Sequence, residues 1–211
     1  MNLEEMGRGF AERFDAKMRA REQALAAARR SIRSSANAIR AIHRGDLDRA
    51  HALMEESREA VVGGLEACRD HPDVAFAGYL QDAQKEYSEA RLTEAAVTGE
   101  DLPGPDELGV QLAPYLNGLA ETVGEIRRHI LDLLRAGEVE ESERLLGAMD
   151  DIYSLLVTID YPDAITGNLR RTTDVARSIM EKTRGDLSLA LVQRDLRDAL
   201  DRHAREVLGK G

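Results

Sequence analysis

The sequence is poor in the residues that cross-link a protein or anchor it in a membrane. Its 211 residues include one cysteine, no tryptophan, three phenylalanines and five tyrosines. Cys68 cannot form an internal disulfide by itself, which fits a reducing compartment, so we expect a cytoplasmic protein. No run of about 18 uncharged apolar residues occurs, so neither a membrane span nor a membrane partner is expected. The N-terminus is charged from its fourth residue, unlike a secretory signal.

The motifs of several common enzyme classes are also missing. The chain has no GxGxxG, P-loop, CxxC or GxSxG motif, which leaves nucleotide-binding and acyl-transfer functions without support. A di-iron carboxylate bundle needs a Glu-x-x-His pair on each of two helices. Glu125 and His129 are four residues apart and no second pair follows, so a ferritin-like site is not supported. His43, His51 and His71 show no ligand spacing, and we interpret them as ordinary surface or packed residues.

The residues that are present indicate an all-α fold. Alanine and long charged residues are abundant and β-type alternation is nearly absent, so the core has to be built mainly from Ala, Leu, Ile and Val. The length suits a single helical domain over residues 1–211. The apolar periodicity and the breaker residues predict seven main helices, over residues 3–44, 47–71, 72–97, 115–135, 139–159, 163–184 and the segment after Gly185. A loop at 98–106 and a short turn at 106–110 precede the fourth.

The helix at 115–135 is expected to organise the fold. Its apolar residues recur at three- and four-residue steps, which is one buried stripe of a helix. Gly118 and Gly124 would allow the backbone of a neighbouring helix to approach closely. Glu121 and Glu125 lie one turn apart on the face away from this stripe.

Two interpretations of the glutamates remain open at this point. Glu86 and Glu89 share a face of the helix at 72–97, just as Glu121 and Glu125 share a face of theirs. On spacing alone, two such pairs are ordinary solvated helix surfaces. Two helices that each offer two carboxylates could instead hold a divalent metal ion between them.

Charge is distributed unevenly along the chain. The net charge of −10 argues against a general nucleic-acid coat protein. Residues 1–50 carry 11 basic against 7 acidic residues, residues 51–150 carry 8 against 22, and residues 151–211 carry 10 against 10. Basic charge is therefore gathered at the N-terminal end, so one side of the folded or assembled protein could still be positive.

The arginines of the first helix form a row. Arg29, Arg33, Arg40 and Arg44 project in nearly the same direction beside its apolar stripe. Guanidinium groups in a row suit a phosphate backbone, because their paired N–H donors match phosphate oxygens. The alternative is a solvated basic face that pairs with the acids of a neighbouring helix.

Three segments together resemble the translin family, and its catalytic partner, translin-associated factor X, more than translin itself. Residues 85–90, Lys-Glu-Tyr-Ser-Glu-Ala, are similar to that partner's Gln-Glu-Tyr-x-Glu-Ala. Residues 115–128 contain Tyr-Leu-x-Gly-Leu-Ala-Glu-x-x-Gly-Glu-Ile-x-Arg, similar to its Tyr-Leu-x-Gly-x-Ala-Asp-x-x-Gly-Glu-Leu-x-Arg, and are the most specific part. Residues 165–185 resemble the family's last long basic helix more weakly. The resemblance covers most of the chain and indicates a single-chain, archaeal-type member.

This resemblance implies a seven-helix translin-like bundle with a long N-terminal helix. It also implies an endoribonuclease that uses Mg²⁺, with Mn²⁺ as a substitute. The family's catalytic and metal-binding acids fall on Glu86, Glu89, Glu121 and Glu125. Glu121 stands where the family's catalytic partner has Asp, and its longer side chain could shift the metal.

The resemblance further implies how RNA is held and how the subunits assemble. Single- or double-stranded RNA is expected to be bound through phosphate contacts by Arg29, Arg33, Arg40, Arg170 and Arg171. The family encloses its RNA in a closed shell of about eight subunits. Because this chain is short and lacks long insertions, we expect it to assemble with itself as a homo-octamer.

Two other functions remain open. The first is a non-catalytic nucleic-acid-binding protein of the same assembly, in which the glutamates are structural. The second is a purely structural helical scaffold. Salt-dependent RNA binding would separate the scaffold from the other two, and Mg²⁺-dependent cleavage would separate the nuclease from the binding protein.

Overall fold

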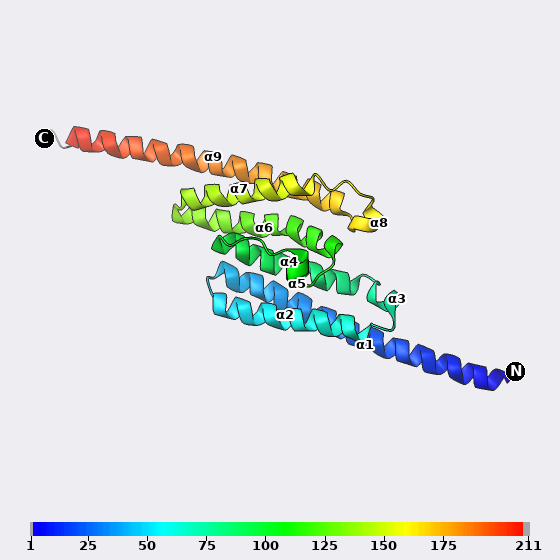
Figure 1. Cartoon of the computed structure of the whole chain (residues 1–211). Helices are drawn as coiled ribbons and strands as arrows, with labels where there is room; N and C mark the ends of the chain where they lie inside the picture. Colours follow the sequence, from blue (N-terminus) through cyan, green and yellow to red (C-terminus); the bar gives the residue numbers. More distant parts are fainter. Residues whose placement is uncertain (1, 209–211) are drawn as a thin grey trace.

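The computed structural model describes residues 2–208, and every regular element in that range is α-helical (Figure 1). Its six long helices are α1 (Leu3–His43), α2 (Leu47–Ala67), α4 (Tyr79–Thr98), α6 (Leu112–Ala136), α7 (Val139–Leu156) and α9 (Leu169–Leu208). Three four-residue helices join them, namely α3 (Pro72–Ala75), α5 (Pro105–Leu108) and α8 (Asp163–Thr166). The all-α prediction is confirmed, as is the long first helix, which spans 41 residues.

The division of the chain into helices differs from the prediction in three places, each of them at a glycine. The helix predicted over 163–184 is divided into α8 and the start of α9 at Gly167, whose φ of +62° ends α8. The helix predicted at 72–97 is divided into α3 and α4, because the chain turns at Gly78, whose φ of +103° favours glycine. Gly185 was expected to end a helix, but α9 continues through it. A glycine inside a helix costs only about 1 kcal/mol against alanine. Buried residues on both sides, Thr183 and Leu187, hold α9 against the bundle and offset that cost.

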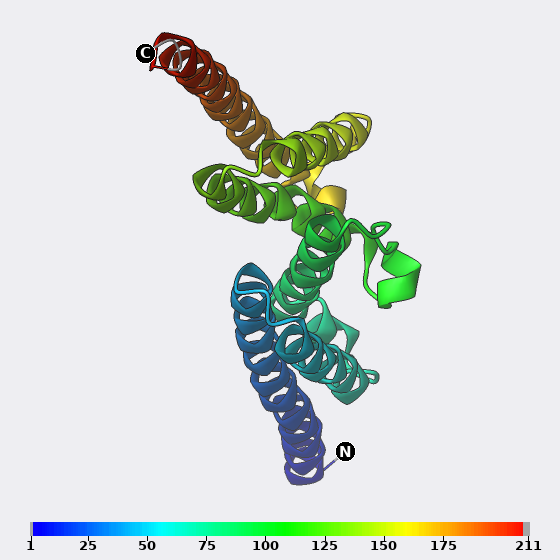
Figure 2. The ribbon, with the colours of Figure 1, turned by 90° about the vertical axis from the view of Figure 1, so that its left-hand side faces the viewer.

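The long helices lie side by side in a stack (Figures 1 and 2). α1 packs against α2 and α4, α4 packs against α6, and α6 packs against α7 and α9. α4 and α6 are therefore the central helices, and each contributes one of the two glutamate pairs. The N-terminal part of α1 and the C-terminal part of α9 extend beyond the stack at opposite ends (Figure 1).

Small side chains bring α1 close to its neighbours. Ala24, Ala28 and Ala38 are fully buried in this contact. The buried hydroxyl oxygens of Ser31 and Ser35 lie 2.7 and 2.8 Å from the hydroxyl oxygen of Ser57 on α2, so these polar groups are paired. Close packing of this kind fixes the C-terminal half of α1 beside α4.

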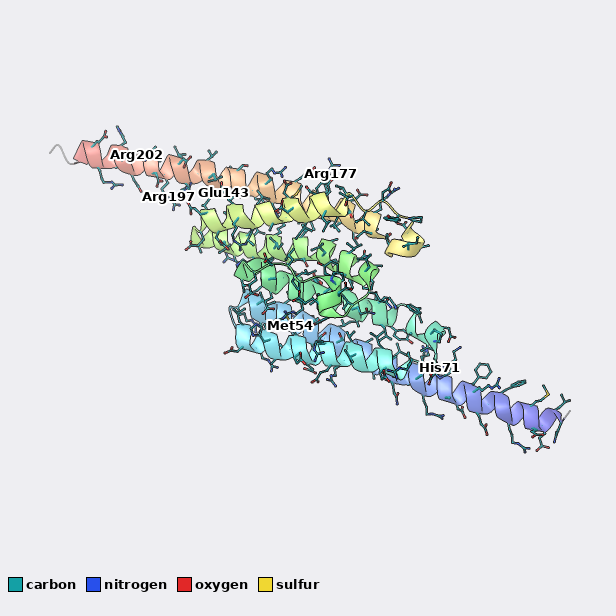
Figure 3. All side chains as sticks on the ribbon, in the orientation of Figure 1. Met54, His71, Glu143, Arg177, Arg197 and Arg202 are labelled. Carbon is teal, nitrogen blue, oxygen red and sulfur yellow. The ribbon has the colours of Figure 1, made fainter. Side chains whose placement is uncertain are left out.

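The two projecting segments carry apolar side chains that no other helix of the described chain covers. Phe10, Phe14 and Met18, which the sequence placed on the apolar stripe of the first helix, are 52%, 71% and 59% exposed. In α9, Val192 and Leu196 are exposed in the same way. Figure 3 shows the side chains of both segments standing clear of the stack. Across the described residues, no helix is both long and apolar enough to cross a membrane.

Candidate functional site

α4 and α6 approach each other closely at Gly118. A Cβ atom at this position would lie 2.7 Å from the carbonyl oxygen of Lys85 and 3.1 Å from the backbone nitrogen of Glu89. Only a glycine hydrogen fits there, so the close approach predicted at Gly118 is confirmed. The same prediction for Gly124 is wrong, because the nearest atom to a Cβ there would be Cδ1 of Ile179 at an ordinary 3.9 Å. The contact at Gly118 brings the acidic face of α4 against that of α6.

Three carboxylates meet where the two helices approach. Glu86 and Glu89 of α4 and Glu121 of α6 each contribute an oxygen, and these oxygens all lie within 4.8 Å of one another. Glu89 is buried, whereas Glu86 and Glu121 are partly exposed. Oxygen ligands at such separations are the type that Mg²⁺ and Mn²⁺ prefer. We call these three residues the acidic cluster.

The acidic cluster holds a proton when no metal is present. Burial raises the pKa of the Glu89 carboxyl to about 8, and the charges of Glu86, Glu121 and Glu125 act in the same direction. At neutral pH Glu89 is therefore mainly protonated. A pKa shifted this far by burial and by neighbouring carboxylates is typical of functional sites.

Lys85 lies inside the acidic cluster. Its Nζ donates hydrogen bonds to both carboxylate oxygens of Glu121, at 2.8 and 2.6 Å, and lies 3.3 Å from an oxygen of Glu86. Burial by itself would lower the pKa of this ammonium group, but the two carboxylates outweigh burial and raise the pKa. The protein therefore supplies a positive charge of its own where a metal ion would bind.

The fourth predicted ligand, Glu125, is held by a histidine. Its Oε2 lies 2.5 Å from Nε2 of His43, which is buried at the end of α1, and 3.8 Å from the guanidinium of Arg128. The hydrogen bond with His43 lowers the pKa of Glu125, so this carboxylate stays ionised. Nδ1 of His43 has no partner among the described residues, and the ring centroids of His43 and His129 are 6.2 Å apart. The structure thus brings three of the four acids together and places the fourth beside them.

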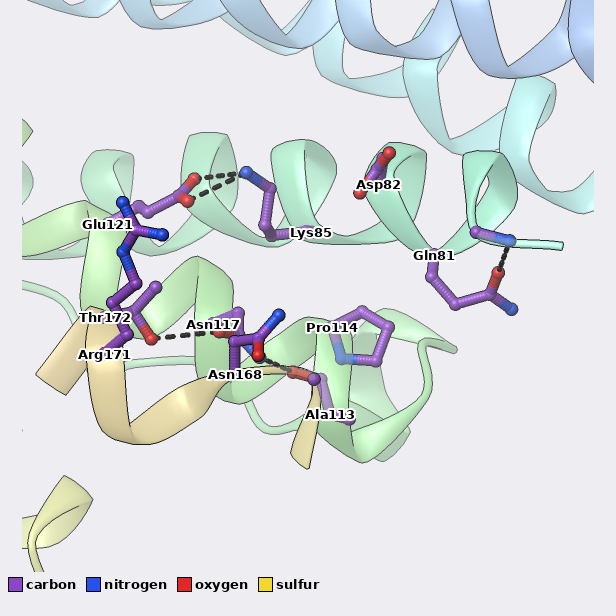
Figure 4. A pocket seen from close by; sticks show the side chains of 12 residues that line it. Gln81, Asp82, Lys85, Ala113, Pro114, Asn117, Glu121, Asn168, Arg171 and Thr172 are labelled. Carbon is purple, nitrogen blue, oxygen red and sulfur yellow. Dashed lines mark hydrogen bonds and ion pairs between the residues drawn. The ribbon is translucent and has the colours of Figure 1, made fainter. Parts of the chain in front are cut away.

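A pocket of about 490 Å³ opens next to the acidic cluster (Figure 4). It lies between the first halves of α4 and α6, the turn after α8 and the start of α9. Figure 4 shows Glu121, Lys85 and Arg171 gathered at one end of it. The pocket therefore combines one edge of the acidic cluster with two positive side chains.

Most amide groups in this pocket are already used by the protein. The Asn117 amide donates to the carbonyl of Thr166 at 2.7 Å and accepts from the hydroxyl of Thr172 at 2.9 Å. Gln81 is bonded to backbone groups around the start of α4. The guanidinium of Arg171 makes no hydrogen bond or ion pair within residues 2–208. Among the charged residues that line the pocket, which are Asp82, Lys85, Glu121 and Arg171, the unpaired guanidinium of Arg171 is the group available to an anionic ligand.

The predicted RNA-binding arginines of α1 are all exposed and make no ion pair within the part of the chain that the structure describes: Arg29, Arg33, Arg40 and, following them, Arg44. Arg40 donates one hydrogen bond to Asn37 at 2.6 Å. Arg30, by contrast, is paired with Glu56 and Glu59 of α2, at 3.4 and 3.5 Å. Within these residues, the row is thus not neutralised by a neighbouring helix.

The two predicted arginines of α9 have different surroundings. Arg171 lines the pocket, as described above. Arg170 points away from it and pairs with Asp160 at 3.0 Å, where both side chains are largely exposed. Only Arg171 is therefore placed next to the acidic cluster.

Lys85 and His43 were not predicted as site residues. Lys85 stands directly before Glu86 in the sequence, and this adjacency was the available signal. His43 is 82 residues away from Glu125, and no spacing in the sequence connects the two. Its contact arises only from the packing of the end of α1 near α6.

Comparisons with known proteins agree with this architecture. No family model matches the sequence. An uncharacterized protein of Methanocaldococcus jannaschii is 32% identical over an alignment of 188 residues, which covers 86% of this chain and 81% of that protein.

Solved structures of the same fold also match. A structure of AfC3PO with duplex RNA has a TM-score of 0.81 at 34% identity, covering 92% of this chain and 98% of that chain. A crystal structure of AfC3PO has a TM-score of 0.78 at 34% identity, covering 92% of this chain and 99% of that chain. Apo-NeC3PO, at 22% identity, shares the fold with a TM-score of 0.77 over 90% of this chain and 97% of that one. The chain therefore belongs to the C3PO family, the family of translin and translin-associated factor X.

Proposed function

We propose that this protein binds RNA and cleaves it as a metal-dependent endoribonuclease, using Mg²⁺ or Mn²⁺, within a shell of eight identical subunits. The observation that carries this proposal is the acidic cluster, which opens onto a pocket lined by Lys85 and Arg171 at the contact of α4 and α6. Carboxylates that hold a cation, next to side chains that hold a phosphate, are the two parts that phosphodiester hydrolysis requires.

The residues present fit a divalent cation. Glu86, Glu89 and Glu121 would hold it, with Glu125 beside them kept ionised by His43. The ammonium of Lys85 already occupies this place, which indicates that the site is electrostatically suited to a cation. When bound, the metal would lower the pKa of a water molecule and offset negative charge on the phosphate. Glu89 has to release its proton for the cation to bind.

The arginines would hold the RNA through its phosphates. Arg171 can bind a phosphate in the pocket, while Arg29, Arg33 and Arg40 form an exposed row on α1 and Arg170 lies further out. Because the amides of Gln81 and Asn117 are engaged within the protein, we expect little discrimination between bases. The structure of AfC3PO with duplex RNA supports this binding for a relative that is 34% identical.

The projecting segments support assembly of identical subunits. The exposed apolar residues of α1 and α9 would be covered if another copy packed on them. Both segments extend away from the acidic cluster, so contacts made by them leave the site accessible. An octamer of this kind would enclose RNA within a shell.

A second candidate is a non-catalytic RNA-binding protein. The ion pair of Lys85 with Glu121 favours this alternative, because a cluster neutralised by the protein itself can be purely structural. The two candidates differ in whether the acidic cluster takes up a divalent ion.

Cleavage of RNA by the purified protein tests the proposed function. Labelled single-stranded RNA and duplex RNA are incubated with Mg²⁺, with Mn²⁺ or with EDTA, and the products are resolved on a denaturing gel. Internal cleavage is expected with either metal and none with EDTA. A Glu86→Gln variant purified in the same way controls for contaminating nucleases. Binding without cleavage in all conditions would contradict the nuclease and favour the second candidate.

RNA binding should depend on the arginine row of α1. Replacing Arg33 and Arg40 together by Ala is expected to weaken binding of all RNA sequences alike. It should also flatten the plot of log affinity against log salt by about one unit for each phosphate that the variant no longer binds. Arg30→Ala, on the same helix but paired with acids of α2, should leave the slope unchanged. A lowered melting temperature with an unchanged slope for the double variant would show that the row is structural.

A further inference from the structure

Lys85 has an unusual position for a surface lysine. Its side chain is only 23% exposed, and its ammonium contacts two of the three carboxylates of the acidic cluster. Both oxygens of Glu121 accept hydrogen bonds from this one group. Oxygens of two of the three carboxylates that would hold a metal ion are therefore already engaged with a cation that belongs to the chain.

A metal ion and this ammonium cannot share Glu121 in the observed arrangement. A small divalent ion binds carboxylate oxygens at about 2.0 to 2.1 Å and repels a positive charge a few ångströms away. The ammonium lies 2.6 Å from one oxygen of Glu121 and 2.8 Å from the other. Entry of the metal thus requires that Lys85 move away from Glu121.

The pocket gives Lys85 a place to move to. Lys85 is one of its lining residues and shares it with Arg171 (Figure 4). A lysine has a flexible four-carbon stem, so its ammonium can change partners without movement of the helix. In the pocket, its positive charge would face the same phosphate as Arg171.

We infer that Lys85 is an exchangeable internal cation, which neutralises the acidic cluster in the metal-free protein, leaves Glu121 when a divalent ion binds, and then contacts the RNA phosphate in the pocket. This inference rests on the proposed function. Lys85 acts as a positioning residue that links the two ligands: metal binding frees the ammonium, and the freed ammonium strengthens RNA binding. By thermodynamic linkage, RNA must then strengthen metal binding by the same factor.

Binding of Mn²⁺ alone tests the first half of this inference. Isothermal titration calorimetry measures the affinity of the metal-free protein for Mn²⁺ in the wild type, in Lys85→Gln and in Lys182→Gln. Lys182 is an exposed lysine of α9, so its variant removes the same charge far from the cluster. Lys85→Gln is expected to bind Mn²⁺ about 10-fold more tightly or better, because the competing charge is gone. Unchanged or weaker binding in this variant, relative to Lys182→Gln, overturns the inference.

RNA binding tests the second half. The probe is a phosphorothioate RNA duplex chosen to resist cleavage, with its affinity measured with and without Mn²⁺. Mn²⁺ should strengthen binding by the wild type, and Lys85→Gln should lose most of that gain although it binds the metal more tightly. If Lys85 had only a structural role, Lys85→Gln would weaken the binding of both Mn²⁺ and RNA, and this result would contradict the inference. Lys85→Arg, which keeps the charge, should retain the gain.

The outcomes separate this inference from the proposed function. If neither the wild type nor Lys85→Gln binds Mn²⁺, the metal site itself is refuted. If the wild type binds Mn²⁺ and Lys85→Gln binds it equally well, the proposed function stands and only the role of Lys85 fails.

Discussion

Replacing Glu89 by Gln is expected to abolish metal-dependent RNA cleavage and, at the same time, to stabilise the metal-free protein at pH 8. Removing a group that only hydrogen-bonds to a metal ligand already lowers metal affinity or activity by about 10- to 100-fold. Loss of one of three converging carboxylates is therefore expected to lower the cleavage rate by at least about 100-fold. Gln has nearly the same shape as protonated Glu, so the packing around it should be kept.

The gain in stability follows from the raised pKa of Glu89. Burial, together with the neighbouring carboxylates, raises the pKa in the folded protein from 4.5 to about 8. Between these two values the unfolded chain has released the proton and the folded chain has kept it, so the free energy of unfolding falls as the pH rises. The fall begins near pH 4.5 and is complete above pH 8. It amounts to on the order of 5 kcal/mol, and Glu89→Gln removes it.

Chemical denaturation in EDTA at several pH values between 5 and 9 measures this effect. The difference between Glu89→Gln and the wild type should be small near pH 5 and largest above pH 8. Glu94→Gln is a matched control, since Glu94 is buried on the same helix but is paired with Arg91 and His51. Its replacement should destabilise the protein, because Arg91 loses its partner. A Glu89→Gln variant that cleaves RNA at the wild-type rate would refute the assignment of this carboxylate.

Gly118→Ala is expected to cost about 2 to 3 kcal/mol of stability and to weaken binding of Mn²⁺. The new methyl group would lie 2.7 Å from the carbonyl oxygen of Lys85, which is backbone and cannot turn aside as a flexible side chain can. α4 and α6 then have to separate, and overpacking of this kind typically costs about 1 to 3 kcal/mol. The same separation would pull Glu121 away from Glu86 and Glu89.

Gly124→Ala provides the control on the same helix. A methyl group at this position meets only Ile179 at 3.9 Å, so the better helix propensity of Ala should raise stability by up to about 1 kcal/mol. In thermal unfolding, the melting temperature of Gly124→Ala should lie above that of the wild type. The melting temperature of Gly118→Ala should lie below it by roughly 5 to 10 °C. Equal effects of the two substitutions would contradict the close contact at Gly118.

The sequence was a good guide wherever local periodicity decides the structure. The bounds of α1, the loop after α4 and the close approach at Gly118 could all be predicted from residue spacing and size. The two glutamate pairs could also be assigned to helix faces, because residues three or four apart share a face. Periodicity shows which residues lie together on a helix, but it does not show what covers them. For this reason the periodicity places Phe10 and Phe14 on the apolar stripe of α1 but does not show that both are exposed.

Contacts between distant segments could not be predicted in this way. The bond between His43 and Glu125 depends on the packing of α1 near α6, and no local pattern encodes that packing. The position of Lys85 depends on which rotamer its side chain adopts once α6 is in place. The prediction for Gly185 failed because a glycine ends a helix only when no tertiary contact holds the chain in helical form beyond it. These three residues show that the local rules fail where the fold brings separate helices together.

The central position of α4 and α6 also determines how often the site opens. Amide hydrogens in the projecting parts of α1 and α9 can exchange with solvent through local fraying, which costs little free energy. Around Gly118 the two helices are enclosed by the stack, so exchange there requires an opening close to global unfolding. Fraying at the two ends of the described chain therefore does not move the carboxylates of the acidic cluster, and it leaves the geometry of the cluster unchanged.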